Sequence, residues 1–170
     1  NTITSLGMDD SGNLWCTNYS GIDCIYSNSS ISWIFPDRRN QLAIYDLEEW
    51  NNKTYIATNN GLYYISNTTT EQCNDVSFKR ISGSTGECWG LDVINNQLFL
   101  AHDQGGFLIT NDNQLKKLPL DPGVWKFLSL QADRLLVGHY YGISVMTKNG
   151  NEWKYSHELE GIGESSRILQ

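Results

Sequence analysis

Aromatic and polar side chains recur at matching positions in this sequence, and both kinds of residue can bind a small ligand. Tyr45, Trp89 and Trp125 stand sixteen or seventeen residues before a glycine that itself recurs along the chain. Flat rings stack on the C–H faces of sugars, while neighbouring amides bind their hydroxyl groups. Polar or aromatic residues just before the same glycines are candidate contacts, namely Asn59, Asn60, Asp103, Tyr140 and Tyr141. These positions predict a carbohydrate site, and the alternative is that the aromatic rings only pack in the core.

Catalysis is a competing interpretation of the same loops. Glycosidases need two carboxylates on one face, and Asp103 and Glu87 are candidates, with His102 or His139 as a base. Each histidine follows an apolar run, which favours a structural hydrogen bond in a loop over a role in proton transfer. We therefore assign no catalytic residue and expect no enzyme activity in this segment.

No pattern predicts a metal or a cofactor. The four cysteines lack Cys-x-x-Cys spacing, so a zinc site is unsupported. The run "DDSGN" (9–13) lacks the bidentate glutamate of a calcium loop and is better interpreted as a turn. Cys16 and Cys24 flank the next turn, where they either face each other across a hairpin or remain free thiols. Whether Cys73 or Cys88 takes part in a disulfide is equally open.

The elements that position these residues form a repeat. Its anchors are Gly21, Gly61, Gly105 and Gly142, at intervals of 40, 44 and 37 residues. Six residues before each anchor stands a large apolar residue: Trp15, Tyr55, Phe99 or Leu136. A short polar turn precedes each of these residues, and another apolar run follows each anchor. We expect the anchor glycines to have positive φ and the large residues to lie between neighbouring sheets.

Each repeat is interpreted as four short antiparallel strands, which is the pattern of a β-propeller blade. The sequence therefore predicts an all-β fold of four blades, approximately 3–43, 44–87, 88–123 and 124–164. Residues 165–170 ("SSRILQ") resemble a first strand again and are expected to begin another blade. The chain starts with Asn1 and shows no signal peptide. We therefore expect these residues to be part of a larger ring within a longer precursor.

The run from Asp9 to Ile22 carries a resemblance to a known family. Its pattern Asp-x-x-Gly-Asn-Leu-Trp-x-Thr-x-x-x-Gly-Ile resembles the two-component regulator propeller repeat, and "TYIATNNGLYYIS" (54–66) is similar to it. The third and fourth repeats depart from this motif, because Gly12 has no counterpart there and Leu136 replaces an aromatic residue.

The resemblance implies a place and a role for the chain. Repeats of this family build seven-bladed propellers in the periplasmic sensor region of hybrid two-component proteins, ahead of a β-sandwich domain, a membrane span and a cytoplasmic output. The implied function is periplasmic or extracellular ligand sensing, often of glycan fragments, in a membrane-anchored protein. Its implied partners are the remaining blades, the downstream β-sandwich and a second copy of the full ectodomain. Two alternatives stay open: a secreted carbohydrate-active enzyme and a non-catalytic protein-interaction propeller.

Composition excludes other partners. The net charge is −7 and the twelve basic residues are scattered, whereas nucleic-acid binding requires clustered Lys and Arg. The same charge favours neutral oligosaccharides over sulfated or phosphorylated ligands. No run of eighteen apolar residues occurs, so we expect no membrane contact by this segment.

Overall fold

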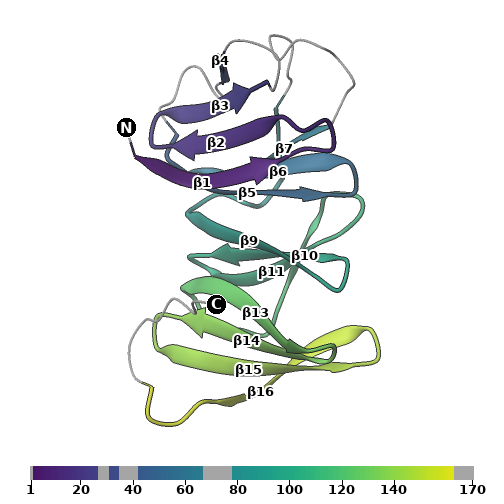
Figure 1. The fold of residues 1–170 in the computed structure, drawn as a ribbon. Coiled ribbons are helices and arrows are strands. Elements are labelled where there is room, and N and C mark those ends of the chain that lie inside the picture. The colour runs from purple at the N-terminus through teal and green to yellow at the C-terminus, as the bar shows by residue number, and fades with distance from the viewer. Residues whose placement is uncertain (1, 27–30, 35–41, 67–77, 163–170) are drawn as a thin grey trace. The chain divides into compact units, whose positions relative to one another are not determined.

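The architecture is all-β. The computed structural model describes residues 2–26, 31–34, 42–66 and 78–162, and within these ranges it has sixteen strands and no helix. The strands form four sheets, each of four antiparallel strands that pair in the order of the chain (Figure 1). This confirms the predicted fold class. Since the described residues include no helix, they include none that could cross a membrane.

The first of two compact units, residues Asn1–Cys88, contains two sheets. Their strands are β1 (Ile3–Met8), β2 (Leu14–Asn18), β3 (Gly21–Ile25) and β4 (Ile31–Ile34), then β5 (Ile44–Trp50), β6 (Lys53–Thr58), β7 (Gly61–Ser66) and β8 (Lys79–Arg80).

The second unit, residues Trp89–Gln170, contains the other two sheets. Their strands are β9 (Cys88–Ile94), β10 (Gln97–His102), β11 (Gly105–Ile109) and β12 (Leu115–Lys117), then β13 (Val124–Gln131), β14 (Arg134–His139), β15 (Gly142–Asn149) and β16 (Glu152–Glu158). Residues 165–170 lie outside the described residues, so their assignment to another blade stays a prediction, as do the exact blade boundaries.

Two asparagines make the turn between the first and second strands of two sheets. Asn51 and Asn52 join β5 to β6 with φ of 51° and 55°, and Asn95 and Asn96 join β9 to β10 with φ of 50° and 58°. Two successive positive φ values characterise the type I′ hairpin turn, and asparagine tolerates this region better than most residues. The polar stretches before the large apolar residues are therefore hairpin turns.

The anchor glycines begin the third strand of each sheet. Gly105 has φ of 121°, and a Cβ there would lie 3.3 Å from the carbonyl oxygen of Leu120. Gly61 has φ of 123°, and a Cβ there would lie 2.9 Å from the carbonyl oxygen of Ser84. Positive φ and close backbone neighbours together explain why the repeat has glycine at this position.

The large residue six positions before the anchor glycine is buried in three of the four repeats, where it is Trp15, Tyr55 or Phe99, as predicted. Trp15 is 6% exposed and clusters with Ile44 and Leu47 of the β5–β8 sheet. Tyr55 is fully buried, with its ring 6.1 Å from that of Trp50. Trp15 thus faces the core between the two sheets of the first unit.

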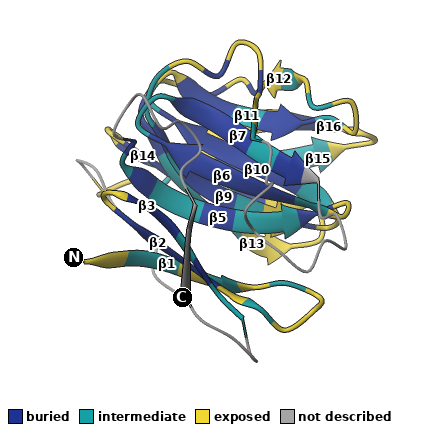
Figure 2. Cartoon of the chain, turned by 90° about the horizontal axis from the view of Figure 1, so that it is seen from above, coloured by how far each residue is buried: buried dark blue, intermediate teal, exposed yellow. Residues whose placement is uncertain are grey.

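The core of the second unit has the same construction. Phe99 is fully buried, and its ring centroid lies 5.0 Å from that of Phe127 and 5.9 Å from that of Trp153, both in the neighbouring sheet. Figure 2 shows buried residues concentrated in the strands and exposed residues in the turns.

Leu136, the large residue of the fourth repeat, faces away from the core of the second unit. Its neighbours Leu135 and Val137 belong to that core, and successive residues of a strand point to opposite faces of the sheet.

One face of the β1–β4 sheet carries exposed apolar side chains. Leu6 is 58% exposed and Met8 is 69% exposed. Thr4 donates a hydrogen bond from Oγ1 to the carbonyl oxygen of Ile44 at 2.8 Å, so Thr4 points to the neighbouring sheet. The pairing of β1 with β2 shifts in register between Ile3 and Ser5. Beyond this shift, Leu6 pairs with Cys16 and Met8 pairs with Leu14. Cys16 and Leu14 flank the inward-facing Trp15, so this face of the sheet is the outer one.

Cys16 and Cys24 lie on opposite faces of this sheet. Trp15 pairs with Cys24 and Cys16 pairs with Asp23, and successive residues of a strand point to opposite sides. The interpretation in which the two thiols face each other across the hairpin is therefore wrong, because the bond needs Cβ atoms on the same side. Cys16, Cys24 and Cys88 are buried, and Cys73 lies outside the described residues.

Candidate ligand-binding site

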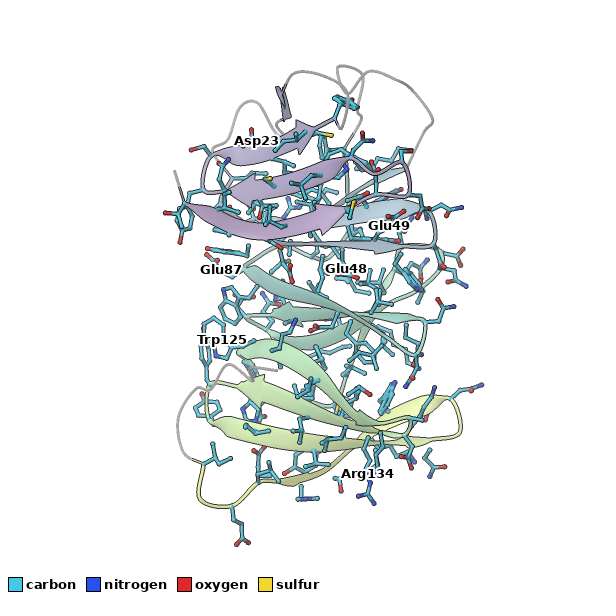
Figure 3. The ribbon with its side chains drawn as sticks, viewed as in Figure 1. Asp23, Glu48, Glu49, Glu87, Trp125 and Arg134 are labelled. Carbon is cyan, nitrogen blue, oxygen red and sulfur yellow. The ribbon has the colours of Figure 1, made fainter. Side chains whose placement is uncertain are left out.

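Three aromatic side chains of the second unit form a compact cluster, which we call the aromatic cluster: Trp89, Trp125 and Tyr140. The two tryptophan rings stack with centroids 4.0 Å apart and planes 26° apart. The Tyr140 ring meets both edge-on, at 5.5 Å from Trp89 and 5.2 Å from Trp125. Figure 3 labels Trp125 where β13 begins. The two tryptophans predicted as stacking platforms therefore form one joint platform, in which each covers a face of the other.

Gly123 makes room for the Tyr140 ring. Its φ is 84°, and a Cβ on it would lie only 1.9 Å from Cδ2 of Tyr140. The Tyr140 N–H donates to the carbonyl oxygen of Gly123 at 3.0 Å, and the Gly123 N–H donates to that of Asp103 at 2.8 Å. Gly123 thus connects the turn before β11 with the turn before β15, and only glycine fits between them.

The indole nitrogen of Trp125 is buried, and among the described residues it has no hydrogen-bond partner. Buried polar groups in folded proteins are nearly always hydrogen-bonded. This donor therefore calls for an acceptor that lies outside the described residues, such as a water or a ligand oxygen.

The polar residues predicted as ligand contacts in the second unit differ in accessibility. Tyr140 is 39% exposed and Tyr141 is 68% exposed. The side chain of Asp103 is 33% exposed, and its Oδ1 lies 2.5 Å from Nδ1 of His102. Tyr141 is thus the most accessible of these residues, and Asp103 is partly engaged by its neighbour.

In each sheet, the last residue of the second strand makes a side-chain hydrogen bond across the turn that follows. Each accepts the backbone N–H two residues further on, and all four acceptors are at most 4% exposed. The contacts are Ser20 N to Asn18 Oδ1 at 2.7 Å, Asn60 N to Thr58 Oγ1 at 3.1 Å, Gln104 N to His102 Nδ1 at 3.0 Å and Tyr141 N to His139 Nδ1 at 3.3 Å. The sequence signal is a hydrogen-bond acceptor three residues before each anchor glycine, which the spacing of aromatic residues does not reveal.

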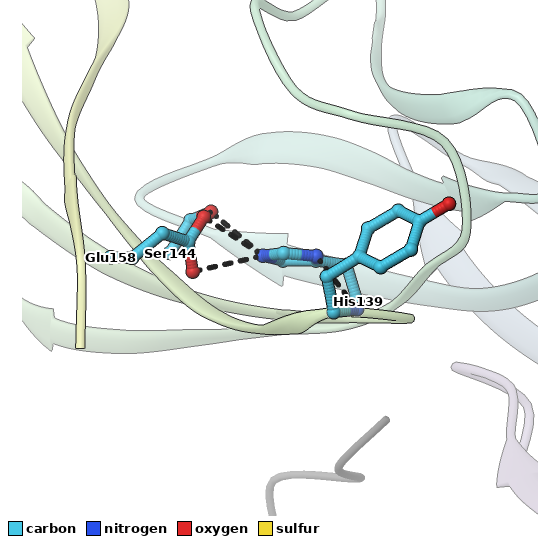
Figure 4. Close-up of polar contacts among 4 residues, drawn as sticks. His139, Ser144 and Glu158 are labelled. Carbon is cyan, nitrogen blue, oxygen red and sulfur yellow. Dashed lines mark hydrogen bonds and ion pairs between the residues drawn. The ribbon is translucent and has the colours of Figure 1, made fainter. Parts of the chain in front are cut away.

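His139 also belongs to a polar network with the buried Ser144 and with Glu158, whose side chain is 42% exposed (Figure 4). Its Nε2 lies 2.9 Å from Ser144 Oγ and 3.1 Å from Glu158 Oε1. The Ser144 hydroxyl donates to Glu158 Oε1 at 2.5 Å. The network joins the end of β16 to the turn between β14 and β15.

This network differs from a hydrolytic triad in the use of the imidazole. In a triad the serine contacts one ring nitrogen and the acid contacts the other. Here Nε2 faces both Ser144 and Glu158, while Nδ1 accepts the Tyr141 N–H. Since the serine proton is already directed to Glu158, the hydroxyl is not activated. Both His102 and His139 accept a backbone N–H through Nδ1, which agrees with the structural role that the sequence favours for them.

In the first unit, Tyr45 is paired with Glu87. Burial, followed by the hydrogen bond and the charge of Glu87, raises the pKa of Tyr45 to about 12. Asn59 is linked to Ala43 twice, because its N–H donates to the Ala43 carbonyl oxygen and its Oδ1 accepts the Ala43 N–H, both at 3.0 Å. Asn59 therefore uses its amide oxygen to support the fold. The N–H of Asn60 donates to Thr58, as described above.

Within the described ranges, no group of three or more His, Cys, Asp or Glu residues is placed to hold a metal ion.

Solved structures share this fold at low sequence identity. The extracellular domain assigned to a hybrid two-component system of B. thetaiotaomicron matches 99% of the chain with a TM-score of 0.75 and 17% identity. Virginiamycin B lyase from Staphylococcus aureus matches 92% of the chain with a TM-score of 0.64 and 13% identity. The extracellular domain assigned to a one-component system of B. thetaiotaomicron matches 93% with a TM-score of 0.54 and 9% identity. No protein-family model and no curated protein matches the sequence.

These matches define the fold and the extent of the chain. At such identities the likeness is one of fold, and it agrees with sheets that are blades of a propeller. The chain spans 24% of the first structure, 55% of the lyase and 28% of the third. It therefore corresponds to only part of each of these molecules.

Proposed function

We propose that this chain is part of an extracellular or periplasmic sensor propeller and that it binds an oligosaccharide at the aromatic cluster. The sensor role is supported by the fold shared with extracellular domains of two-component and one-component systems. The single observation that carries the ligand site is the buried indole N–H of Trp125, which has no partner among the described residues and stands within stacked aromatic rings.

A sugar suits the chemistry of this cluster. The joint platform of Trp89 and Trp125 can stack on a pyranose ring, and the Trp125 N–H can donate to a hydroxyl or ring oxygen. Tyr140 and Tyr141 add phenolic hydroxyls at exposed positions. The chain carries a net charge of −7, so a neutral glycan fits better than a sulfated one.

The proposal includes further blades of the same protein as partners. Leu6 and Met8 leave an apolar face of the first sheet exposed, and Leu136 faces away from the core of its own unit. Soluble proteins rarely expose such surface without a partner. Neighbouring blades of a larger ring would cover both faces. We also propose that the protein continues into a downstream β-sandwich, a membrane anchor and a cytoplasmic output, and that its whole ectodomain forms a dimer.

An enzyme is the second candidate, because a lyase shares the fold. Against it, both histidines accept backbone hydrogen bonds within turns, and Glu87 is hydrogen-bonded to Tyr45. The two candidate bases, His102 and His139, and the candidate carboxylate Glu87 therefore already have hydrogen-bond partners.

Calorimetric titration of the full chain with a panel of neutral oligosaccharides tests the proposal. We expect Trp125→Phe to weaken binding about tenfold, because the variant keeps the aromatic face but loses the N–H donor. Tyr155→Phe is the matched control, since Tyr155 is 47% exposed and lies on β16 outside the cluster. Equal affinities of wild type and Trp125→Phe would reject the site, and conversion of any glycan into product would favour the enzyme.

A further inference from the structure

The outer face of the first sheet carries a cross-strand row of three side chains, which we call the outer row: Leu6, Cys16 and Asp23. Leu6 pairs with Cys16, and Cys16 pairs with Asp23. Residues directly opposite each other on neighbouring strands have their side chains on the same face of a sheet. The outer row therefore lies on the face where Leu6 is 58% exposed.

The second sheet of the first unit has an equivalent row, and there a neighbouring sheet covers it. Leu47 pairs with Ile56, and Ile56 pairs with Tyr63. Ile56 stands five residues before its anchor glycine and Tyr63 two residues after it, at the same offsets as the second and third members of the outer row. All three residues are at most 7% exposed, and they belong to one core cluster with Trp15 of the first sheet.

The second unit repeats this arrangement with Phe127, Val137 and Ser144. These residues pair in the same order, and the last two have the same offsets from their anchor glycine. Phe127 and Val137 belong to one core cluster with Phe99 of the β9–β12 sheet, and Ser144 is 3% exposed. In both units the row is thus covered by the sheet face that carries the large residue of the repeat. The outer row has the position at which the repeat places another sheet.

Asp23 distinguishes the outer row from the two covered rows, in which Tyr63 and Ser144 are uncharged. The described contacts give its carboxylate one side-chain hydrogen bond, from Asn18 Nδ2 to Oδ2 at 2.9 Å, and leave Oδ1 without a partner among the described residues. Burial raises the pKa of Asp23, and the hydrogen bond from Asn18 opposes this only in part. A sheet placed over this face would exclude the remaining water, and an unpaired carboxylate is costly to bury.

We propose that the outer row is the docking surface for a further sheet of the same repeat type, and that this sheet places an arginine or lysine side chain over the Asp23 carboxylate. A cationic group hydrogen-bonds strongly to a carboxylate, while its aliphatic stem can lie over Leu6 and Cys16. A purely apolar face would leave the charge unpaired, so Asp23 selects which sheet binds here. The inference rests on the proposed function only in taking further blades of the same protein as the partner.

The methyl group of Met8 can report on this face in the absence of any partner. The chain has two methionines, of which Met8 is 69% exposed and Met146 is fully buried. The full chain, labelled with carbon-13 in the methionine methyl groups, is titrated with 4-phenylbutylguanidine and separately with the neutral 4-phenylbutanol. The row spans two strand spacings, about 10 Å, which the extended cation can bridge. We expect the Met8 resonance to respond to the cation with an affinity about fivefold higher than to the alcohol, and Met146 to respond to neither.

Two matched variants show whether Asp23 causes this preference. Asp23→Asn keeps the size of the side chain and an oxygen for Asn18 but removes the charge, so we expect it to bind the two compounds equally. Asp10→Asn is the control, because Asp10 is an exposed carboxylate in the turn between β1 and β2, and we expect it to keep the preference. Equal binding of both compounds by the wild type, or a preference for the cation that persists in Asp23→Asn, would overturn the inference.

Sedimentation velocity of the full chain tests the other possible occupant, a second copy of the chain. We expect the wild type and Leu6→Glu to sediment alike, because neither offers the other copy a cationic partner for Asp23. A dimer that Leu6→Glu dissociates would assign the outer row to self-association and overturn the proposal. Absence of oligosaccharide binding would leave both measurements intact and would count against the proposed ligand site alone.

Discussion

The two units of the chain make the same turn with different chemistry. In the first unit the residue before the turn is Asn18 or Thr58, and in the second it is His102 or His139. All four accept one backbone N–H at the same place in the repeat. The fold therefore specifies an acceptor at this position and leaves its identity open. A titratable acceptor occurs in the unit that also contains the aromatic cluster.

The comparison predicts first that the cores of the two units are equivalent. We expect Phe99→Ala in the second unit and Trp15→Ala in the first each to cost about 3–5 kcal/mol of unfolding free energy, because each removes a buried ring between two sheets. Chemical denaturation of both variants measures this. If only one variant were destabilised, the units would not share the same inter-sheet packing.

The second prediction concerns a glycine that only the second unit uses to seat a ring. We expect Gly123→Ala to cost about 2–4 kcal/mol, because a Cβ both overlaps Tyr140 and forces a positive φ on alanine. Gly12→Ala in the first unit is the control, since its φ is 78° but no atom lies within 4 Å of the added Cβ. We expect the control to cost about 1–2 kcal/mol. Near-ultraviolet circular dichroism should change only in Gly123→Ala, and an unchanged spectrum would contradict the packing of Tyr140.

The third prediction concerns the turn acceptor of the first unit. Thr58→Val keeps the shape of the side chain but removes the hydroxyl that accepts the Asn60 N–H and donates to the Gly61 carbonyl oxygen. We expect a loss of about 1–2 kcal/mol. This loss should be the same at pH 7.5 and pH 5.5, values chosen to span histidine titration, because the hydroxyl does not titrate there. A strong pH dependence would show that the contrast between the two units is incorrect.

The smallest effect is expected at Asp9, which gives the first unit an acid-sensitive turn of its own. Burial alone would raise the pKa of Asp9, but hydrogen bonds from the Trp15 indole, from Asn13 and from the Ser11 N–H outweigh it and lower the pKa. A lowered folded-state pKa gives stability that is present above the usual carboxyl value and is lost as pH falls through the folded value.

Asp9→Asn tests that contribution. We expect it to cost about 0.5–1 kcal/mol at neutral pH, because an amide oxygen accepts weaker hydrogen bonds than a carboxylate. The difference from wild type should shrink as the pH falls through the lowered pKa of the Asp9 carboxyl. Urea denaturation at neutral and acidic pH measures the difference in unfolding free energy between the two proteins. A difference that grows on acidification would contradict a lowered pKa of Asp9 in the folded state.

The sheets and turns could be predicted from the sequence because a blade is a local structure. The glycine anchors and the large residues six positions earlier sit in one hairpin, so their spacing directly reports strand register. The asparagine pairs at 51–52 and 95–96 likewise have a local requirement for positive φ.

The arrangement of the site could not be predicted in the same way. Trp89 and Trp125 belong to different sheets, and their 4.0 Å stacking depends on how two sheets pack, which no spacing within a repeat encodes. The pairing of Tyr45 with Glu87 likewise joins β5 to the segment just before β9, which lies far along the chain. The failed pairing of Cys16 and Cys24 has a simpler cause, since a shift of one residue in register moves a side chain to the other face.

The two cysteines of the first sheet, Cys16 and Cys24, are poorly placed to react with an oxidant, because both are buried and they lie on opposite faces. Oxidants attack the thiolate, and burial, followed by the charge of Asp23, raises the pKa of the Cys16 thiol. Of the two methionines in the chain, Met146 is fully buried and Met8 is 69% exposed. Among the sulfur atoms of the described residues, Met8 is therefore the one most accessible to an oxidant, and its sulfoxide would put a polar group on the outer apolar face of the first sheet. In this sheet, chemical ageing would begin at the outer face and leave the thiols of Cys16 and Cys24 unchanged.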